Sequence, residues 1–116
     1  MNIDIFIPAR LESTRLPKKH LEKINKITLI EHLVNRLKKV KKIRKIIVCT
    51  TNKNEDNQLV NFLIQKKILY FRGSEKDILK RFIDAAEEFN TDIIIDIEGD
   101  KLYTEPKFVD NIISEM

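Results

Sequence analysis

The sequence has little of several residues that small proteins use to fix their structure or to hold cofactors. It contains one cysteine, Cys49, no tryptophan and only two glycines among its 116 residues. A single cysteine excludes a disulfide within the chain and makes a cysteine-based zinc site implausible, which fits a reducing compartment. With two glycines the chain has neither GxxxxGK[ST] nor GxGxxG, so kinase-like nucleotide binding and the common dinucleotide-binding turn are disfavoured.

Long apolar runs are also missing. No stretch approaches the roughly 18 consecutive apolar residues that a membrane-spanning helix needs. The N-terminal MNIDIFIPAR carries an acid and no basic leader, which predicts a strand and not a signal peptide, and hence a cytoplasmic location. The composition, 42% hydrophobic and 34% charged, is typical of a globular chain. We therefore expect one domain over residues 1–116.

Short β-branched runs alternate with longer amphipathic segments, a pattern typical of βαβ units and a parallel sheet. Strands are predicted at 2–8, 45–51, 68–71 and 92–97. We expect an α/β, Rossmann-like three-layer αβα fold with a mainly parallel sheet in the order 3-2-1-4. In such an order strands one and four are neighbours, and ligands bind in the crevice at their carboxyl ends.

The helices are predicted from capping signals and from apolar positions that share one face. Thr28 and Glu31 have capping-box spacing, which predicts that the first helix starts near Thr28. A second helix is predicted over 55–66. Ser74 and Asp77 predict the start of a third, and Pro106, a residue favoured in the first turn, the start of a fourth.

The segment PARLESTRLPKKHL, residues 8–21, follows the first predicted strand and has one acid against four cations. The cations are Arg10, Arg15, Lys18 and Lys19. Like charges so close together repel one another unless a polyanion neutralises them, and a nucleoside triphosphate carries about four negative charges. Arginine can bind phosphate oxygens bidentately and lysine provides a movable charge. The segment predicts a phosphate site, although composition alone also fits a solvated basic loop.

Acidic residues mark the end of the last predicted strand. Asp100 follows Gly99 directly after the apolar run, where its carboxylate would meet the crevice. Mg²⁺ takes one or two carboxylates together with phosphate oxygens, so a metal ligand fits here. Aspartate after glycine is also a common turn, and the residues alone leave both readings open. Asp96 could face the crevice or lie at an exposed strand end.

Three stretches resemble the CMP-sugar synthetases, which are the cytidylyltransferases for 3-deoxy-manno-octulosonate and acylneuraminate, and their relatives among spore-coat polysaccharide proteins. The first resembles the family's N-terminal ARxxSxRLPxKxL signature and matches it at eight positions: Ala9, Arg10, Ser13, Arg15, Leu16, Pro17, Lys19 and Leu21. FRGSEKDILKRF, residues 71–82, and EGD, residues 98–100, also look like the family. Lys18 stands where the family usually has glycine. The resemblance spans almost the whole chain, which corresponds to about half of a usual member.

The resemblance implies a nucleotidyltransferase that transfers CMP from CTP to an acidic 2-keto sugar and releases pyrophosphate, with Mg²⁺ as cofactor, in surface polysaccharide or glycan synthesis. The residues implied to handle the triphosphate are Arg10, Ser13, Arg15 and Lys19. Those implied to hold the base and ribose are Pro8, Ala9 and Arg10 through their backbone, and Arg72, Gly73 and Ser74. The implied metal ligand is Asp100. The residues expected to carry catalysis are Arg10, Arg15, Lys19 and Asp100.

Other functions stay open at this point. One is a nucleotide-binding domain that does not catalyse alone and pairs with a partner chain, either a second copy or a separate C-terminal half. Another is RNA binding through RLKKVKKIRK, residues 36–45, which is disfavoured because cations at a helix end also complement the helix dipole. His20 and His32 have no partner at metal-ligand spacing, and Cys49 is expected to pack in the core.

Overall fold

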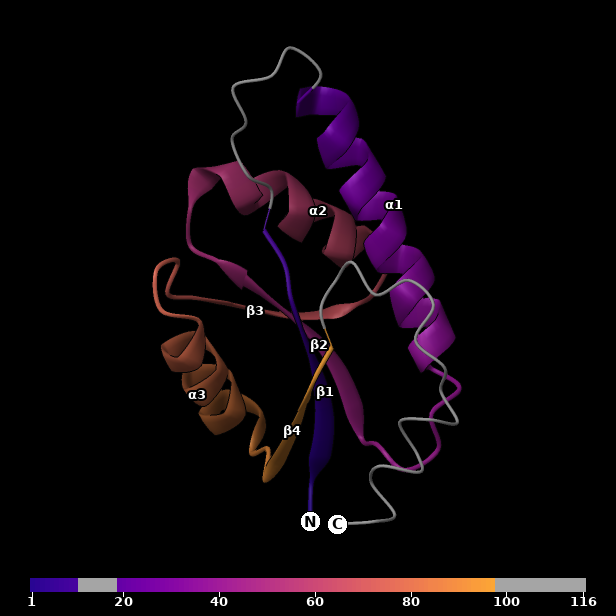
Figure 1. The fold of residues 1–116 in the computed structure, drawn as a ribbon, viewed down its shortest axis with the longest axis vertical. Coiled ribbons are helices and arrows are strands. Elements are labelled where there is room, and N and C mark those ends of the chain that lie inside the picture. Colours follow the sequence, from indigo (N-terminus) through magenta and orange to yellow (C-terminus); the bar gives the residue numbers. More distant parts are fainter. Residues whose placement is uncertain (11–18, 98–116) are drawn as a thin grey trace.

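The computed structural model describes the backbone of residues 1–10 and 19–97, and the side chains of 1–10, 27 and 29–97. Strands and helices alternate along this part of the chain (Figure 1). The elements are β1 (Ile3–Pro8), α1 (Lys19–Leu37), β2 (Lys45–Thr51), the 3₁₀ helix η1 (Asn54–Asp56), α2 (Asn57–Gln65), β3 (Leu69–Gly73), α3 (Ile78–Phe89) and β4 (Ile93–Asp96). The strands form one parallel sheet in the order β3-β2-β1-β4, which confirms the predicted order.

Helices cover both faces of the sheet, with α1 and α2 on one side and α3 on the other (Figure 1). Alternate residues of β1 therefore enter two different cores. Ile5 and Ile7 pack with α1 and α2, where Leu33 is fully buried, whereas Phe6 packs against α3. The Phe6 and Phe82 rings meet edge to face with centroids 5.5 Å apart. The predicted three-layer αβα architecture is confirmed, and burial on both faces explains why the strands are almost continuously apolar.

Helix α1 begins earlier than predicted, at Lys19 and not near Thr28. Threonine and glutamate three residues apart also occur inside helices, and no glycine or proline interrupts residues 19–37. The Glu31 carboxylate lies 3.2 Å from Lys66 Nζ, an ion pair with the residue after α2. Helix α1 therefore starts, with Lys19 as its first residue, at the same edge of the sheet as the carboxyl end of β1 (Figure 1).

The other elements differ from prediction by a few residues. β2 has the predicted bounds, β3 extends to Gly73, and the predicted helix over 55–66 is divided into η1 and α2. Helix α3 starts after Asp77, whose carboxylate accepts a hydrogen bond from Lys80 N at 3.0 Å, as expected of an N-cap. The helix predicted from Pro106 lies outside the described residues.

A buried carboxylate holds the amino-terminal edge of the sheet together. Asp4 in β1 is fully buried and accepts hydrogen bonds from Arg44 Nε at 3.1 Å and Arg44 Nη2 at 2.7 Å. It also accepts from Lys45 N at 3.0 Å and from Thr91 Oγ1 at 2.5 Å. Asp4 thus joins β1 to the start of β2 and to the turn before β4. Burial alone would raise the pKa of Asp4, but the hydrogen bonds from Arg44 and Thr91 and the charge of Arg44 outweigh it, so the pKa is lowered.

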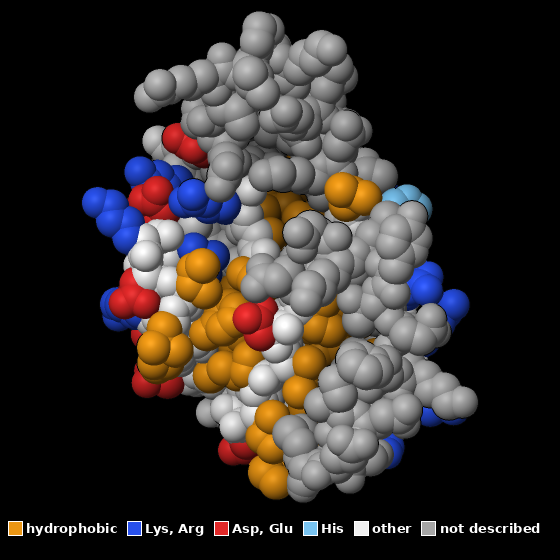
Figure 2. All heavy atoms as spheres, viewed as in Figure 1, with side chains coloured by type: hydrophobic (Ala, Val, Ile, Leu, Met, Phe, Trp, Pro, Cys, Tyr) orange, Lys and Arg blue, Asp and Glu red, His pale blue; other side chains and the backbone are white. Residues whose placement is uncertain are grey.

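Part of the α3 surface is apolar. Ile78, Leu79 and Ile83 are 53%, 69% and 48% exposed, and Figure 2 shows apolar side chains gathered over this region. In the part of the chain that the structure describes, no helix combines the length and the apolar character needed to cross a bilayer.

Candidate functional site

The carboxyl edge of the sheet brings the end of β1 next to the end of β2. Pro8 pairs with Cys49, and Ala9 N donates a hydrogen bond to the Cys49 carbonyl at 3.0 Å. This bond continues the pairing by one residue, so Arg10 leaves the sheet in a fixed direction. In the order β3-β2-β1-β4, β2 lies on one side of β1 and β4 on the other, and open α/β sheets bind ligands beside such a reversal of strand order, at the carboxyl ends of the strands.

A cavity of about 500 Å³ opens at this edge, a volume in the range of small-molecule sites. It lies between the end of β1 and the segment that leads from β3 into α3. Its lining residues are Pro8, Ala9, Arg10, Glu75, Lys76, Ile78 and Arg81. Three of these seven side chains are cationic and one is acidic, so the lining favours an anionic ligand.

Arg81 forms the base of this cavity and is only 2% exposed. Its guanidinium donates to three backbone carbonyls, those of Ser74 at 2.8 Å, Cys49 at 3.4 Å and Glu75 at 3.3 Å. Burial lowers the pKa of Arg81, and the charge of nearby Arg10 acts in the same direction. An arginine keeps its charge under these conditions, so Arg81 adds a fixed positive charge below the cavity and holds the 74–75 backbone in place.

Gly73 allows α3 to approach the end of β3 closely. A Cβ built on Gly73 would lie 2.8 Å from Phe71 Cε2 and 3.1 Å from Arg81 Cγ. Carbon atoms do not approach that closely, so a Cβ at position 73 would require the Phe71 ring and the Arg81 side chain to shift. The need for glycine here is therefore one of packing.

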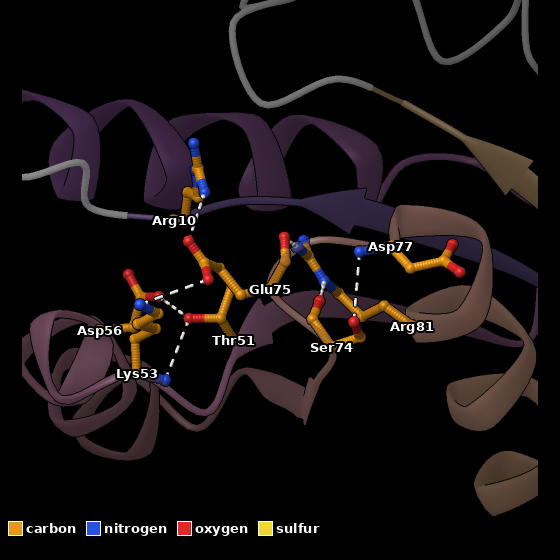
Figure 3. A network of polar contacts seen from close by, with 8 residues as sticks. All are labelled: Arg10, Thr51, Lys53, Asp56, Ser74, Glu75, Asp77 and Arg81. Carbon is orange, nitrogen blue, oxygen red and sulfur yellow. Dashed lines mark hydrogen bonds and ion pairs between the residues drawn. The ribbon is translucent and has the colours of Figure 1, made fainter.

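Glu75 lies between two cations that come from other segments (Figure 3). Its carboxylate is 3.4 Å from Arg10 Nη1 and 3.3 Å from Lys53 Nζ. Arg10 extends from the end of β1, and Lys53 belongs to the segment between β2 and α2. Glu75 thus connects three neighbouring segments at the mouth of the cavity.

The segment between β2 and α2 is fixed by its own polar contacts. Thr51 Oγ1 donates to the Asp56 carboxylate and accepts a hydrogen bond from Lys53 N at 3.2 Å. Arg72 donates to the carbonyls of Thr51 and Lys53, both at 2.8 Å, and to Asn57 Oδ1 at 2.9 Å. The Arg72 guanidinium is therefore directed toward this segment, and Arg72 positions Lys53.

The structure brings some of the sequence-predicted site residues together at the cavity. Pro8, Ala9 and Arg10 line it. Of the described residues in the second predicted group, Arg72, Gly73 and Ser74 lie beside it and do not belong to its lining. Ser74 supports the turn before α3, because its hydroxyl accepts a hydrogen bond from Asp77 N at 3.2 Å.

Other predicted residues fall where the structure gives no side chain. Lys19 is the first residue of α1, and only its backbone is described. Ser13, Arg15 and Asp100 lie outside the described residues, so their assignments stay predictions. Asp96, whose place was left open, is exposed at the end of β4.

Sequence reasoning missed Glu75 and Arg81 as site residues. A signal for Arg81 was present, because position 81 lies next to Phe82 and four residues before Ala85, on the apolar face of the helix, which predicts an inward-facing arginine. An arginine on an inward face needs partners, and here they are the carbonyls around the cavity. Glu75 had no comparable signal, because its partners are distant in sequence.

A Mg²⁺ site at this edge would take its carboxylate from outside the described residues. Among the residues whose side chains the structure describes, 1–10, 27 and 29–97, there is no group of three or more His, Cys, Asp or Glu side chains that could enclose a metal. Mg²⁺ bound with a nucleotide needs only one or two carboxylates, since phosphates and waters supply the other ligands. The predicted ligand, Asp100, follows β4 by four residues in the sequence, and its carboxylate has the hard oxygen donors that Mg²⁺ prefers.

The basic run over 36–45 is partly used inside the fold. Besides Asp4, Arg44 Nη2 bonds to the Phe89 carbonyl at 2.5 Å, and Lys45 Nζ lies 5.5 Å from the centre of the Phe89 ring. Arg36 is in the last turn of α1, where a cation complements the helix dipole. These contacts give the run a structural role.

Comparison with known proteins gives a consistent result. A family model described as cytidylyltransferase matches residues 5–116. The spore coat polysaccharide biosynthesis protein SpsF of Bacillus subtilis is 33% identical over 118 residues, covering 97% of this chain and 49% of that protein. A 3-deoxy-manno-octulosonate cytidylyltransferase of Geobacter metallireducens is 27% identical over 116 residues, covering 100% of this chain and 45% of that protein.

A solved structure agrees with this match. The structure of a cytidylyltransferase from Leptospira borgpetersenii superposes with a TM-score of 0.83 at 31% identity and covers 100% of this chain and 49% of that one. The chain thus spans about half the length of the relatives that it matches.

Proposed function

This chain belongs to the cytidylyltransferase family, and from that premise we propose that it forms the nucleotide-binding half of an enzyme that transfers CMP from CTP to a sugar with release of pyrophosphate. The observation that carries the proposal is the cavity in which Arg10 and Arg81 meet at the carboxyl edge of the sheet. This is the edge at which parallel α/β sheets bind nucleotides, and cationic linings bind phosphates.

In this proposal the cavity binds CTP and the residues around it neutralise the triphosphate. Arg10 binds phosphate oxygens from one side, while Arg81, which is only 2% exposed, adds positive charge at the base of the cavity. The backbone of Pro8 and Ala9 holds the cytosine. Arg15 and Lys19 stabilise the negative charge that develops on the departing pyrophosphate, and most of the catalysis comes from positioning and charge neutralisation.

Asp100 would hold the proposed Mg²⁺ together with oxygens of the bound triphosphate. The ion, when bound, would neutralise phosphate charge and polarise the α-phosphoryl oxygens, which makes the α-phosphorus easier to attack. In this proposal Asp100 supplies the carboxylate that holds the ion and the 8–21 segment supplies cations, so that the ion and the cations together would neutralise the triphosphate.

The proposed acceptor is an acidic 2-keto sugar. Support comes from a relative named for 3-deoxy-manno-octulosonate and from another named for spore-coat polysaccharide biosynthesis. The acceptor hydroxyl would attack the α-phosphorus of CTP directly, with no covalent enzyme intermediate. A role in surface polysaccharide synthesis in the cytoplasm would follow from this chemistry.

Calorimetric titration with CTP and Mg²⁺ tests nucleotide binding. We expect Arg15→Ala and Asp100→Ala each to weaken CTP binding by about tenfold or more, because each removes a charged contact with the ligand. Lys39→Ala is the control for Arg15→Ala, since Lys39 is exposed just after the carboxyl-terminal end of α1, and that end of the helix lies away from the carboxyl end of β1 (Figure 1). CTP binding that is absent, or that is indifferent to both site variants, would contradict the proposal.

A second candidate is a nucleotide-binding domain that becomes active only with another polypeptide. One observation favours it: α3 exposes the apolar side chains of Ile78, Leu79 and Ile83, which another polypeptide could cover. Pyrophosphate release from CTP with 2-keto sugar acids separates the two candidates. Turnover by this chain alone supports the enzyme, whereas CTP binding without turnover supports the partner-dependent domain.

A further inference from the structure

Glu75, the acidic residue in the lining of the cavity, forms ion pairs with cations that an anionic ligand would need. Glu75 Oε1 lies 3.4 Å from Arg10 Nη1, and Glu75 Oε2 lies 3.3 Å from Lys53 Nζ. Each carboxylate oxygen therefore pairs with a cation from a different segment. Figure 3 shows the carboxylate between the two basic side chains. A phosphate group with two free oxygens could make the same pair of contacts.

A ligand can replace these ion pairs at little energetic cost. The side chains of Arg10, Lys53 and Glu75 are 44%, 52% and 28% exposed, and exposed ion pairs contribute little because water competes for both partners. The backbone of Glu75 is held separately, since its carbonyl accepts a hydrogen bond from Arg81 at 3.3 Å. The Glu75 side chain can therefore rotate away while the cavity keeps its shape.

We propose that Glu75 acts as an internal substitute for phosphate, which holds Arg10 and Lys53 in the free protein and is displaced when a polyphosphate binds. The inference rests on the proposed nucleotide site. It makes Glu75 a residue that selects ligands by charge. A triphosphate can form ion pairs with both Arg10 and Lys53 and so displace the carboxylate, whereas an uncharged nucleoside cannot and leaves the Glu75 ion pairs intact.

The substitution Glu75→Gln tests this proposal because it keeps the size of the side chain and removes its charge. The competing ion pairs and the repulsion between Glu75 and a bound phosphate are both lost. We expect binding of CTP and of inorganic tripolyphosphate to become about three- to tenfold tighter, the range set by two exposed ion pairs. Binding of cytidine is expected to stay unchanged.

A matched control is Glu88→Gln, which makes the same change of net charge at the other end of α3, where Glu88 is exposed. The three proteins are titrated with CTP, tripolyphosphate and cytidine at one low ionic strength, because salt screens exposed charges. We expect Glu88→Gln to bind all three ligands as the unsubstituted protein does.

The outcomes separate this inference from the proposed function. CTP and tripolyphosphate binding that is equal or weaker in Glu75→Gln overturns the inference and leaves a CTP site intact. Weaker cytidine binding would instead mean that Glu75 contacts the base, and it also overturns the inference. Tighter tripolyphosphate binding without any CTP binding supports the displacement by phosphate and contradicts the proposed function. No binding of either polyphosphate by any of the three proteins rejects both.

Discussion

Replacing Asp4 by asparagine should strongly destabilise the fold without changing its shape. The carboxylate is fully buried and accepts two hydrogen bonds from Arg44, one from Lys45 N and one from Thr91 Oγ1. Asparagine keeps one acceptor oxygen and turns an amide toward donors, so at least one charge-assisted contact is lost and the pairing of charges is removed. From the cost of breaking such buried contacts we expect the free energy of unfolding to fall by about 3 kcal/mol.

Urea denaturation followed by circular dichroism measures this loss, since the chain has no tryptophan to report by fluorescence. With a slope of about 1–1.5 kcal/mol per molar urea for a protein of this size, the midpoint should fall by about 2 M. Asp84→Asn is the control, because Asp84 makes only a surface ion pair of 3.2 Å with Lys80 on α3. The control is expected to change the stability by less than about 0.5 kcal/mol.

The effect of Asp4 should also depend on pH. The pKa of Asp4 is lowered in the folded protein, so the unfolded chain binds the proton more readily. The ionised Asp4 carboxylate makes its full contribution to the free energy of unfolding above the ordinary aspartate pKa of about 4. This contribution is lost as the pH falls through the lower pKa that Asp4 has in the folded protein. The difference in free energy of unfolding between the unsubstituted protein and Asp4→Asn should therefore be constant above about pH 5 and become smaller in acid. A midpoint within experimental error of the unsubstituted protein at neutral pH, or a difference that persists unchanged in strong acid, would refute this reasoning.

Three further predictions concern the core around the cavity. Gly73→Ala should destabilise the protein by about 1–3 kcal/mol in urea titrations, since its Cβ would lie 2.8 Å from Phe71 Cε2; an unchanged midpoint would contradict this packing. Arg81→Met should cost about 3 kcal/mol and weaken CTP binding, because carbonyls of the 74–75 segment lose their donor. Burial raises the pKa of the Cys49 thiol to about 12, so Ellman's reagent should react with it in urea and not in the folded protein; fast reaction without urea would show that the end of β2 opens.

Much of the fold could be predicted from local patterns. The run KIIVCTT has the bounds of β2 in the structure, and Asp77 caps α3 as the sequence indicates. Such signals are reliable because a strand in a sheet covered on both faces must be apolar, and because a helix start leaves amide groups that need a nearby acceptor. The capping-box spacing of Thr28 and Glu31 misled the prediction of α1, since the same spacing fits the interior of a longer helix.

The candidate site could be predicted only in outline. The order of the strands and the basic 8–21 segment indicated an anion site at the carboxyl ends of the strands, and Pro8 to Arg10 do line a cavity there. The contribution of Glu75 could not be predicted, because its partners Arg10 and Lys53 are distant in sequence and meet it only after β1, β2 and β3 align.

Arg72 and Arg81 show where the limit lies. The sequence by itself determined the strands, the helices, their layering on a parallel sheet and a preference for an anionic ligand, because these follow from the period of apolar residues and from local charge. It placed both arginines in one stretch, FRGSEKDILKRF. Only the tertiary structure decided that Arg72 turns toward the segment after β2 while Arg81 lies beneath the cavity. The physical reason is that a guanidinium goes where carbonyl acceptors converge, and these acceptors come from segments that the fold alone brings together.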